Sequence, residues 1–89
     1  MIDSTYRGEI VHALTAYDIR QSKKRFYNPY ALGLYMQALE RADELVAEGK
    51  SMRYALVKSF TGPLLRAVGK AVGITFTKDE INYGFPVAE

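Results

Sequence analysis

Hydrophobic residues recur at helical spacing along most of the chain, and this pattern predicts an all-α fold. The clearest stretch begins at Asn28, a favoured N-cap, followed by Pro29 at the first helical position. It runs through Glu48, and Gly49 supplies the left-handed residue that ends a helix. Because its apolar positions cover more than half of the circumference, we expect a central helix that contacts at least two neighbours. These positions are Ala31, Leu32, Leu34, Tyr35, Met36, Ala38, Leu39, Ala42, Leu45 and Val46.

The segment before this helix shows the same spacing. Its apolar and aromatic residues predict a helix over about residues 5–20, with Ser4 or Thr5 as the N-cap. Residues 21–27 show no clear period, and we expect a basic loop or a frayed extension of the first helix. The stripe of the first helix consists of Tyr6, Ile10, Ala13, Leu14 and Tyr17.

Two shorter helices are predicted after the long one. Ser51 is a favoured N-cap for a third helix, whose apolar stripe includes Leu56 and Phe60. Pro63 disfavours helical geometry at the residue before it, so it ends this helix and starts a fourth one. Gly73 ends the fourth helix, whose apolar side consists of Leu64, Leu65, Ala67, Val68, Ala71 and Val72.

A short helical turn is expected near the C-terminus. Thr77 and Glu80 match a capping box, in which each side chain accepts a hydrogen bond from the other residue's backbone N–H. They predict a turn over residues 78–83, and Phe85 and Pro86 are expected to pack the tail against the bundle. Short connections favour antiparallel neighbours. We therefore predict a single domain over residues 1–89, folded as a compact antiparallel bundle of about four helices with a short C-terminal helical turn or tail.

Composition narrows the classes of function. The chain has 89 residues, a net charge of +2, 48% hydrophobic residues and 25% charged ones, which is the balance of an ordinary globular protein. It has no cysteine, which excludes disulfides, thiolate metal sites and a cysteine nucleophile. No apolar run has the length of a membrane span and no signal peptide is visible, so we expect a cytoplasmic protein without membrane contact.

Two features with candidate catalytic chemistry favour structural interpretations. The run Gly49-Lys50-Ser51 resembles the end of a P-loop. However, the motif requires a glycine at position 44, where this chain has Glu44, and a helix is predicted where the motif needs a strand. His12 is the only histidine, lies off the apolar stripe and lacks a nucleophile and metal ligands at suitable spacing. We interpret His12 as a surface residue and expect a non-enzymatic protein without a metal or another cofactor.

The long helix carries two acidic features. Glu40, Glu44 and Glu48 form a carboxylate row on its polar face, which we interpret as a solvated face that could contact a basic partner. Asp43 instead falls inside the apolar arc, where an unpaired carboxylate would be costly. We predict that a basic group or a helix N-terminus pairs with Asp43, because buried charges are normally paired.

Charge is distributed unevenly along the chain. The segment from Gly49 to Lys78 has no acidic residue, and its basic residues suit phosphates, so nucleic-acid binding is the alternative function. The fourth helix would be the recognition helix, although only Arg66 and Lys70 would reach a groove. The same charges are also typical of a surface that merely keeps a bundle soluble. The basic residues of this segment are Lys50, Arg53, Lys58, Arg66, Lys70 and Lys78.

Tyrosine content favours a protein partner. The chain has seven tyrosines, and tyrosine and arginine are common interface anchors. We therefore expect a protein-binding module, acting as a small regulator or inhibitor by surface contact. The size and composition also suit accessory proteins of phages and mobile elements, such as anti-CRISPR or anti-restriction inhibitors, and are compatible with a homo-oligomer. The expected contact residues are Arg25, Tyr27, Tyr30, Tyr54 and Lys58.

Overall fold

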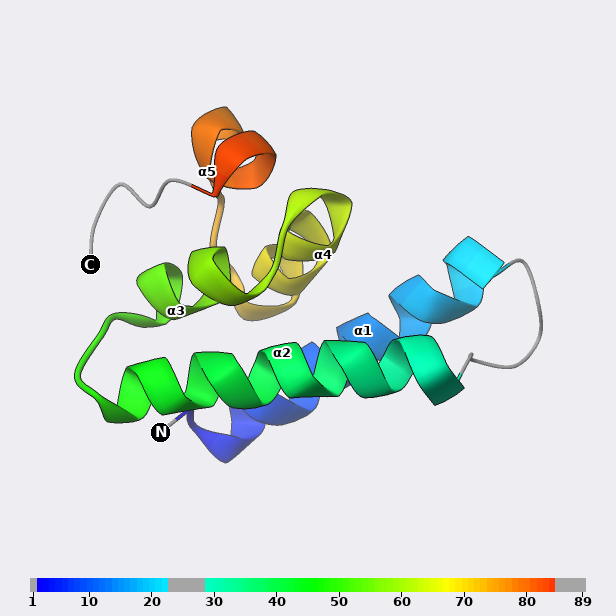
Figure 1. The fold of residues 1–89 in the computed structure, drawn as a ribbon, viewed down its shortest axis with the longest axis horizontal. Helices are drawn as coiled ribbons and strands as arrows, with labels where there is room; N and C mark the ends of the chain where they lie inside the picture. Colours follow the sequence, from blue (N-terminus) through cyan, green and yellow to red (C-terminus); the bar gives the residue numbers. More distant parts are fainter. Residues whose placement is uncertain (1, 23–28, 85–89) are drawn as a thin grey trace.

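Helices account for all the regular structure in the computed structural model, which describes residues 2–22 and 29–84 (Figure 1). The all-α prediction, with four helices and a short C-terminal one, is confirmed. The radius of gyration is 12.4 Å, close to the ~12 Å typical of a folded chain of this length. The elements are α1 (Ser4–Ser22), α2 (Pro29–Ala47), α3 (Met52–Ser59), α4 (Gly62–Val72) and α5 (Lys78–Tyr83).

Two predicted N-caps close the starts of α3 and α5. The Ser51 hydroxyl accepts a hydrogen bond from the Tyr54 backbone N–H at 3.1 Å. The Thr77 hydroxyl accepts from the Glu80 N–H at 3.1 Å, and the Glu80 carboxylate accepts from the Thr77 N–H at 2.8 Å. The capping box is therefore confirmed. The predicted cap Asn28 and the tail residues Phe85 and Pro86 lie outside the described residues.

The long helices end close to the predicted positions. α1 continues to Ser22, two residues past the predicted end, so the start of the expected basic loop is helical. α2 ends at Ala47, just before the predicted Glu48. Gly49 has φ +99°, and the Lys50 N–H bonds to the Leu45 carbonyl at 3.1 Å, which closes the helix end.

The helices pack in pairs around one core. α1 lies mainly against α4, and α2 lies mainly against α3 while also contacting α1. The expected two neighbours of α2 are confirmed, but α4 has the more central position because it contacts α1, α3 and α5. Figure 1 shows α2 returning alongside α1, with α5 on the side of the molecule away from α2. The core consists of Ile2, Ile10, Leu14, Leu39, Ala42, Ala55, Leu56, Val57, Phe60, Leu65, Val68 and Phe76.

Two residues of the predicted apolar stripes are exposed. Tyr6 on α1 is 47% exposed and Leu34 on α2 is 49% exposed, so the expectation that they join the core is wrong. Each stripe is wider than the face that the neighbouring helices cover, because α1 packs mainly against α4 and α2, and α2 packs mainly against α3 and α1. Periodicity alone does not show which edge of a stripe stays open.

Asp43 is paired, as predicted. Its carboxylate accepts a hydrogen bond from the Ile2 backbone N–H at 2.5 Å and lies 3.7 Å from an Arg7 guanidinium nitrogen. Ile2 itself is buried in the core. Asp43 therefore ties the start of the chain to the C-terminal half of α2, and its role is structural.

Candidate functional site

A cleft of about 370 Å³ opens where α4, α5 and the segment between them meet. Its floor is apolar, and three cations from both helices surround it. We call it the α4–α5 cleft. The floor consists of Ile74, Phe76 and Ile81, the rim consists of Arg66, Lys70 and Lys78, and Thr75 completes the lining.

A glycine on α4 lets the floor lie directly against the helix. Gly69 is buried, and a Cβ atom at this position would contact the Phe76 ring and come within 2.7 Å of the Ile74 carbonyl oxygen. The chain reverses at Gly73, whose φ of +79° favours glycine, and the Ile74 N–H then bonds to the Gly69 carbonyl at 2.8 Å. The position of Phe76 is thus set by backbone contact with α4.

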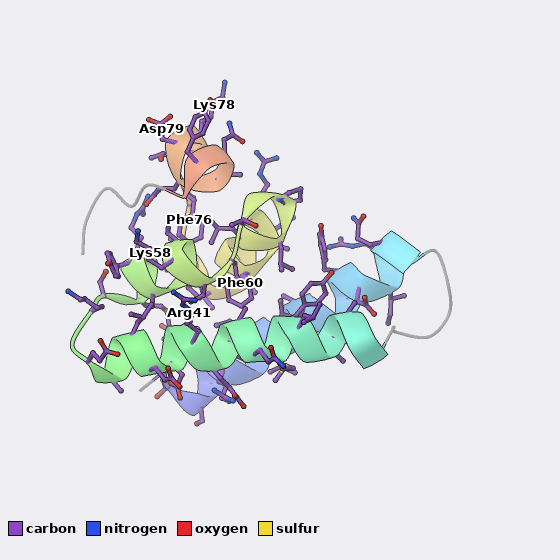
Figure 2. All side chains as sticks on the ribbon, viewed as in Figure 1. Arg41, Lys58, Phe60, Phe76, Lys78 and Asp79 are labelled. Atoms are coloured by element: carbon purple, nitrogen blue, oxygen red, sulfur yellow. The ribbon has the colours of Figure 1, made fainter. Side chains whose placement is uncertain are left out.

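An ion pair between a partly exposed arginine and a buried glutamate joins α3 to α5 next to Phe76. Glu80 is fully buried, and the Arg53 guanidinium donates to both of its carboxylate oxygens, at 2.8 and 2.5 Å. The same guanidinium donates to the Thr75 carbonyl at 3.1 Å and lies 5.4 Å from the centre of the Phe76 ring. Figure 2 shows Phe76 in the space between α3 and α5. Phe76 is therefore held between the Gly69 backbone and the Arg53 guanidinium.

The pKa of Arg53 is raised, mainly by its hydrogen bonds to Glu80 and also by the charge of Glu80. Burial acts in the opposite direction and lowers this pKa, but its effect is smaller. The sequence placed Arg53 among the nucleic-acid contacts, whereas the structure shows that its charge is paired within the chain. The sequence pattern did not identify Glu80 as the partner of Arg53, because the two residues are 27 positions apart. Only the capping role of Glu80 has a local signal in the sequence.

The rim cations are exposed and adjacent. Arg66 and Lys70 lie one turn apart on α4, and Lys78 begins α5, where Figure 2 shows it at the outer end of the helix. In the described part of the chain, none of the three has an ion-pair partner. Sequence reasoning identified these charges but missed the floor, because Ile74 and Phe76 lie in a segment without helical periodicity.

A second cationic surface lies on α3 and the residues that precede it. Lys50, Tyr54 and Lys58 stand four residues apart, and the two ammonium groups lie 5.4 and 5.8 Å from the centre of the Tyr54 ring. We call this group the cation–tyrosine face. It brings together two expected partner contacts, Tyr54 and Lys58, and two cations of the alternative set, Lys50 and Lys58.

The other expected contact residues precede or begin α2. Arg25 and Tyr27 lie outside the described residues, and Tyr30 lies in α2 but its side chain is outside the description. The basic and aromatic segment before α2 therefore stays a prediction.

The other acidic groups and the histidine of the described chain lie outside the lining of the cleft. His12 and the row Glu40, Glu44 and Glu48 are exposed, as predicted, and the row borders an open groove with Arg41. Among residues 2–22 and 29–84, no cluster of three or more His, Asp or Glu side chains is arranged to hold a metal. In the same ranges, none of the helices combines the length and apolar composition needed to cross a membrane.

One buried carboxylate, on α1, escaped the sequence analysis. Asp18 is 3% exposed and lies near Tyr35, which packs edge-on against Tyr17 with ring centres 6.1 Å apart. Burial raises the pKa of Tyr35, and the charges of Tyr17 and Asp18 add to the effect. This cluster joins α1 to α2 away from the cleft.

Comparison of the chain with protein-family models, with curated proteins and with solved structures found no match. We therefore interpret the cleft from its own residues.

Proposed function

We propose that this chain is a non-enzymatic protein-binding module, which regulates or inhibits its partner by occupying the partner's surface. The observation that carries the proposal is the α4–α5 cleft, where an open apolar floor meets three exposed cations. Protein interfaces combine an apolar centre, which loses its water on binding, with a polar rim that stays wet. The cation–tyrosine face adds the residue types that commonly anchor such contacts.

Charge at the cleft favours an acidic partner. Arg66, Lys70 and Lys78 are exposed, and the described residues of the lining include no carboxylate to offset them. A negatively charged surface would be attracted over about one Debye length, ~8 Å at physiological salt, and would associate faster for that reason.

Nucleic acid, the alternative partner, fits the cleft less well. Sequence-tolerant binding of single strands depends on aromatic rings that are open for base stacking. Phe76 is only 8% exposed and is covered by Gly69 and Arg53. Of the six predicted phosphate contacts, Arg53 is already paired with Glu80.

Affinity capture from cells that naturally contain the chain tests the proposed function. The bait is the full chain, with and without nuclease treatment, compared with two charge-reversal variants. One variant is Arg66→Glu/Lys70→Glu, in the cleft. The matched control is Arg20→Glu/Arg41→Glu, which makes the same change in net charge at exposed positions outside the cleft.

We expect the wild type and the control variant to retain the same protein after nuclease treatment, and the cleft variant to lose it. The retained protein, once purified, should bind the chain directly and without nucleic acid. Loss of all partners on nuclease treatment would contradict the proposal and support the alternative. Equal capture by the two variants would show that the cleft is not the contact site.

A further inference from the structure

The floor of the α4–α5 cleft is an apolar surface with a fixed shape. Phe76 is nearly buried, and backbone contact with Gly69 and the Arg53 guanidinium hold its ring in place. Ile74 and Ile81, which flank it, remain partly exposed. An apolar group entering the cleft would cover these side chains without first having to order them, and such preorganisation favours binding.

The size of the cleft limits what enters. A volume of about 370 Å³ is near the lower end of the ~300–1,000 Å³ range of small-ligand pockets, so it has room for one large side chain. A folded domain edge or a whole helix would not fit inside. The group that enters must therefore project from a segment that runs across the rim.

The rim sets the charge of that segment. Arg66 and Lys70 stand on one wall and Lys78 on the other, so an occupant crossing the cleft passes cations on both sides. Asp79, next to Lys78, does not line the cleft, and Glu80 faces Arg53. A carboxylate on either side of the apolar anchor would therefore meet a cation of the lining.

Resting on the proposed function, we infer that the α4–α5 cleft binds a linear acidic segment of the partner protein, with one large apolar side chain on the floor and flanking carboxylates at Arg66, Lys70 and Lys78.

The test uses a defined peptide and the isoleucine methyl signals of the full chain. The probe is an acetylated and amidated heptapeptide in which a central phenylalanine has three acidic residues on each side. A second peptide replaces the phenylalanine with serine, and a third arm uses oligo-dT of similar charge. Ile74 and Ile81 report on the cleft, while the core residues Ile2 and Ile10 report on the fold.

We expect the phenylalanine peptide to shift the Ile74 and Ile81 methyl signals and to leave those of Ile2 and Ile10 in place. The serine peptide should bind about tenfold more weakly, because burial of a large apolar side chain contributes at least that factor. The variant Arg66→Gln/Lys70→Gln should also bind the phenylalanine peptide more weakly, while its Ile2 and Ile10 signals stay unchanged.

Three results would overturn the inference. They are unmoved Ile74 and Ile81 signals, equal affinity for the two peptides, and a response to oligo-dT alone. If the peptides fail while a purified partner still depends on Arg66 and Lys70, the inference fails and the proposed function stands. If the partner does not depend on these residues either, the cleft is not its contact site and the inference fails, whereas loss of every protein partner on nuclease treatment would overturn the proposed function as well.

Discussion

Gly69 shows how the absence of one side chain shapes the candidate site. Because it has no Cβ, the segment returning from α4 lies against the helix backbone and brings Phe76 under α5. Any larger residue would have to push Phe76 or the Ile74 carbonyl aside. The floor of the cleft therefore depends on a position that carries no chemistry of its own.

Gly69→Ala tests this role. We expect it to lower the free energy of unfolding by about 1–3 kcal/mol, the usual effect of overpacking a filled site. Gly33→Ala is the matched control, because Gly33 lies within α2 and no atom of the described residues lies within 4 Å of an added Cβ. Alanine there should be neutral or stabilising by about 0.5–1 kcal/mol. Urea unfolding followed by circular dichroism measures both, and equal stability of the two variants would contradict the packing described.

Tyr35 makes the stability of the fold fall with pH in the alkaline range. Its raised pKa keeps the phenol protonated in the folded state above pH ~10, where an unfolded tyrosine loses its proton. The folded state then binds more protons, so this stabilisation is complete below pH ~10 and is lost as pH rises through the folded pKa. Tyr35→Phe should therefore show a smaller fall in unfolding free energy between about pH 9 and about pH 11 than the wild type. An identical fall in both proteins would disprove the linkage.

At the scale of elements, the Arg53–Glu80 pair fixes how α5 sits on the bundle. α5 has six residues, too few to be a stable helix alone, and it contacts chiefly α4. The ion pair adds a link to α3, which precedes α4 in the chain. Contacts with both α3 and α4 therefore position α5 at the cleft.

Removing Arg53 should destabilise the fold more than removing the whole charge pair. Arg53→Met removes the guanidinium that donates to both oxygens of the fully buried Glu80 carboxylate, and we expect a loss of about 3–5 kcal/mol. Arg53→Met/Glu80→Gln should recover part of that loss, since no charge stays buried. Thermal unfolding tests this, with Arg66→Met as an exposed control expected within about 0.5 kcal/mol of wild type. If the double variant is less stable than Arg53→Met, the pair is not what holds α5.

The contacts between elements show which features of this fold can be predicted from the sequence. The caps at Ser51 and Thr77 were predictable because each signal lies within three residues of its partner. The pairing of Asp43 was predictable from its place in an apolar arc, but its contact with Ile2 was not, because 41 residues separate them. The cleft depends on packing of Phe76 against Gly69 and on the Arg53–Glu80 pair, and neither has a local pattern.

For the whole molecule, the structure separates stability from the charged rim of the proposed binding surface. The core consists of buried apolar side chains, whereas the rim cations are exposed and have no ion-pair partner in the described chain. We expect Arg66→Glu/Lys70→Glu to change the free energy of unfolding by no more than about 1 kcal/mol, since isolated surface substitutions have small effects. A much larger loss in chemical denaturation would mean that these cations serve the fold and that their effect on capture is indirect.

Site-specific photocrosslinking at the cleft tests the central claim most directly. A photoreactive amino acid replaces Thr75 in the cleft lining or, as the control, exposed Gln37 on α2. The account predicts that the Thr75 probe forms a nuclease-resistant adduct with one protein, joined through an acidic segment of that protein, and that the Gln37 probe forms none. An adduct at Gln37 alone, or an adduct at Thr75 that consists of nucleic acid, would contradict it.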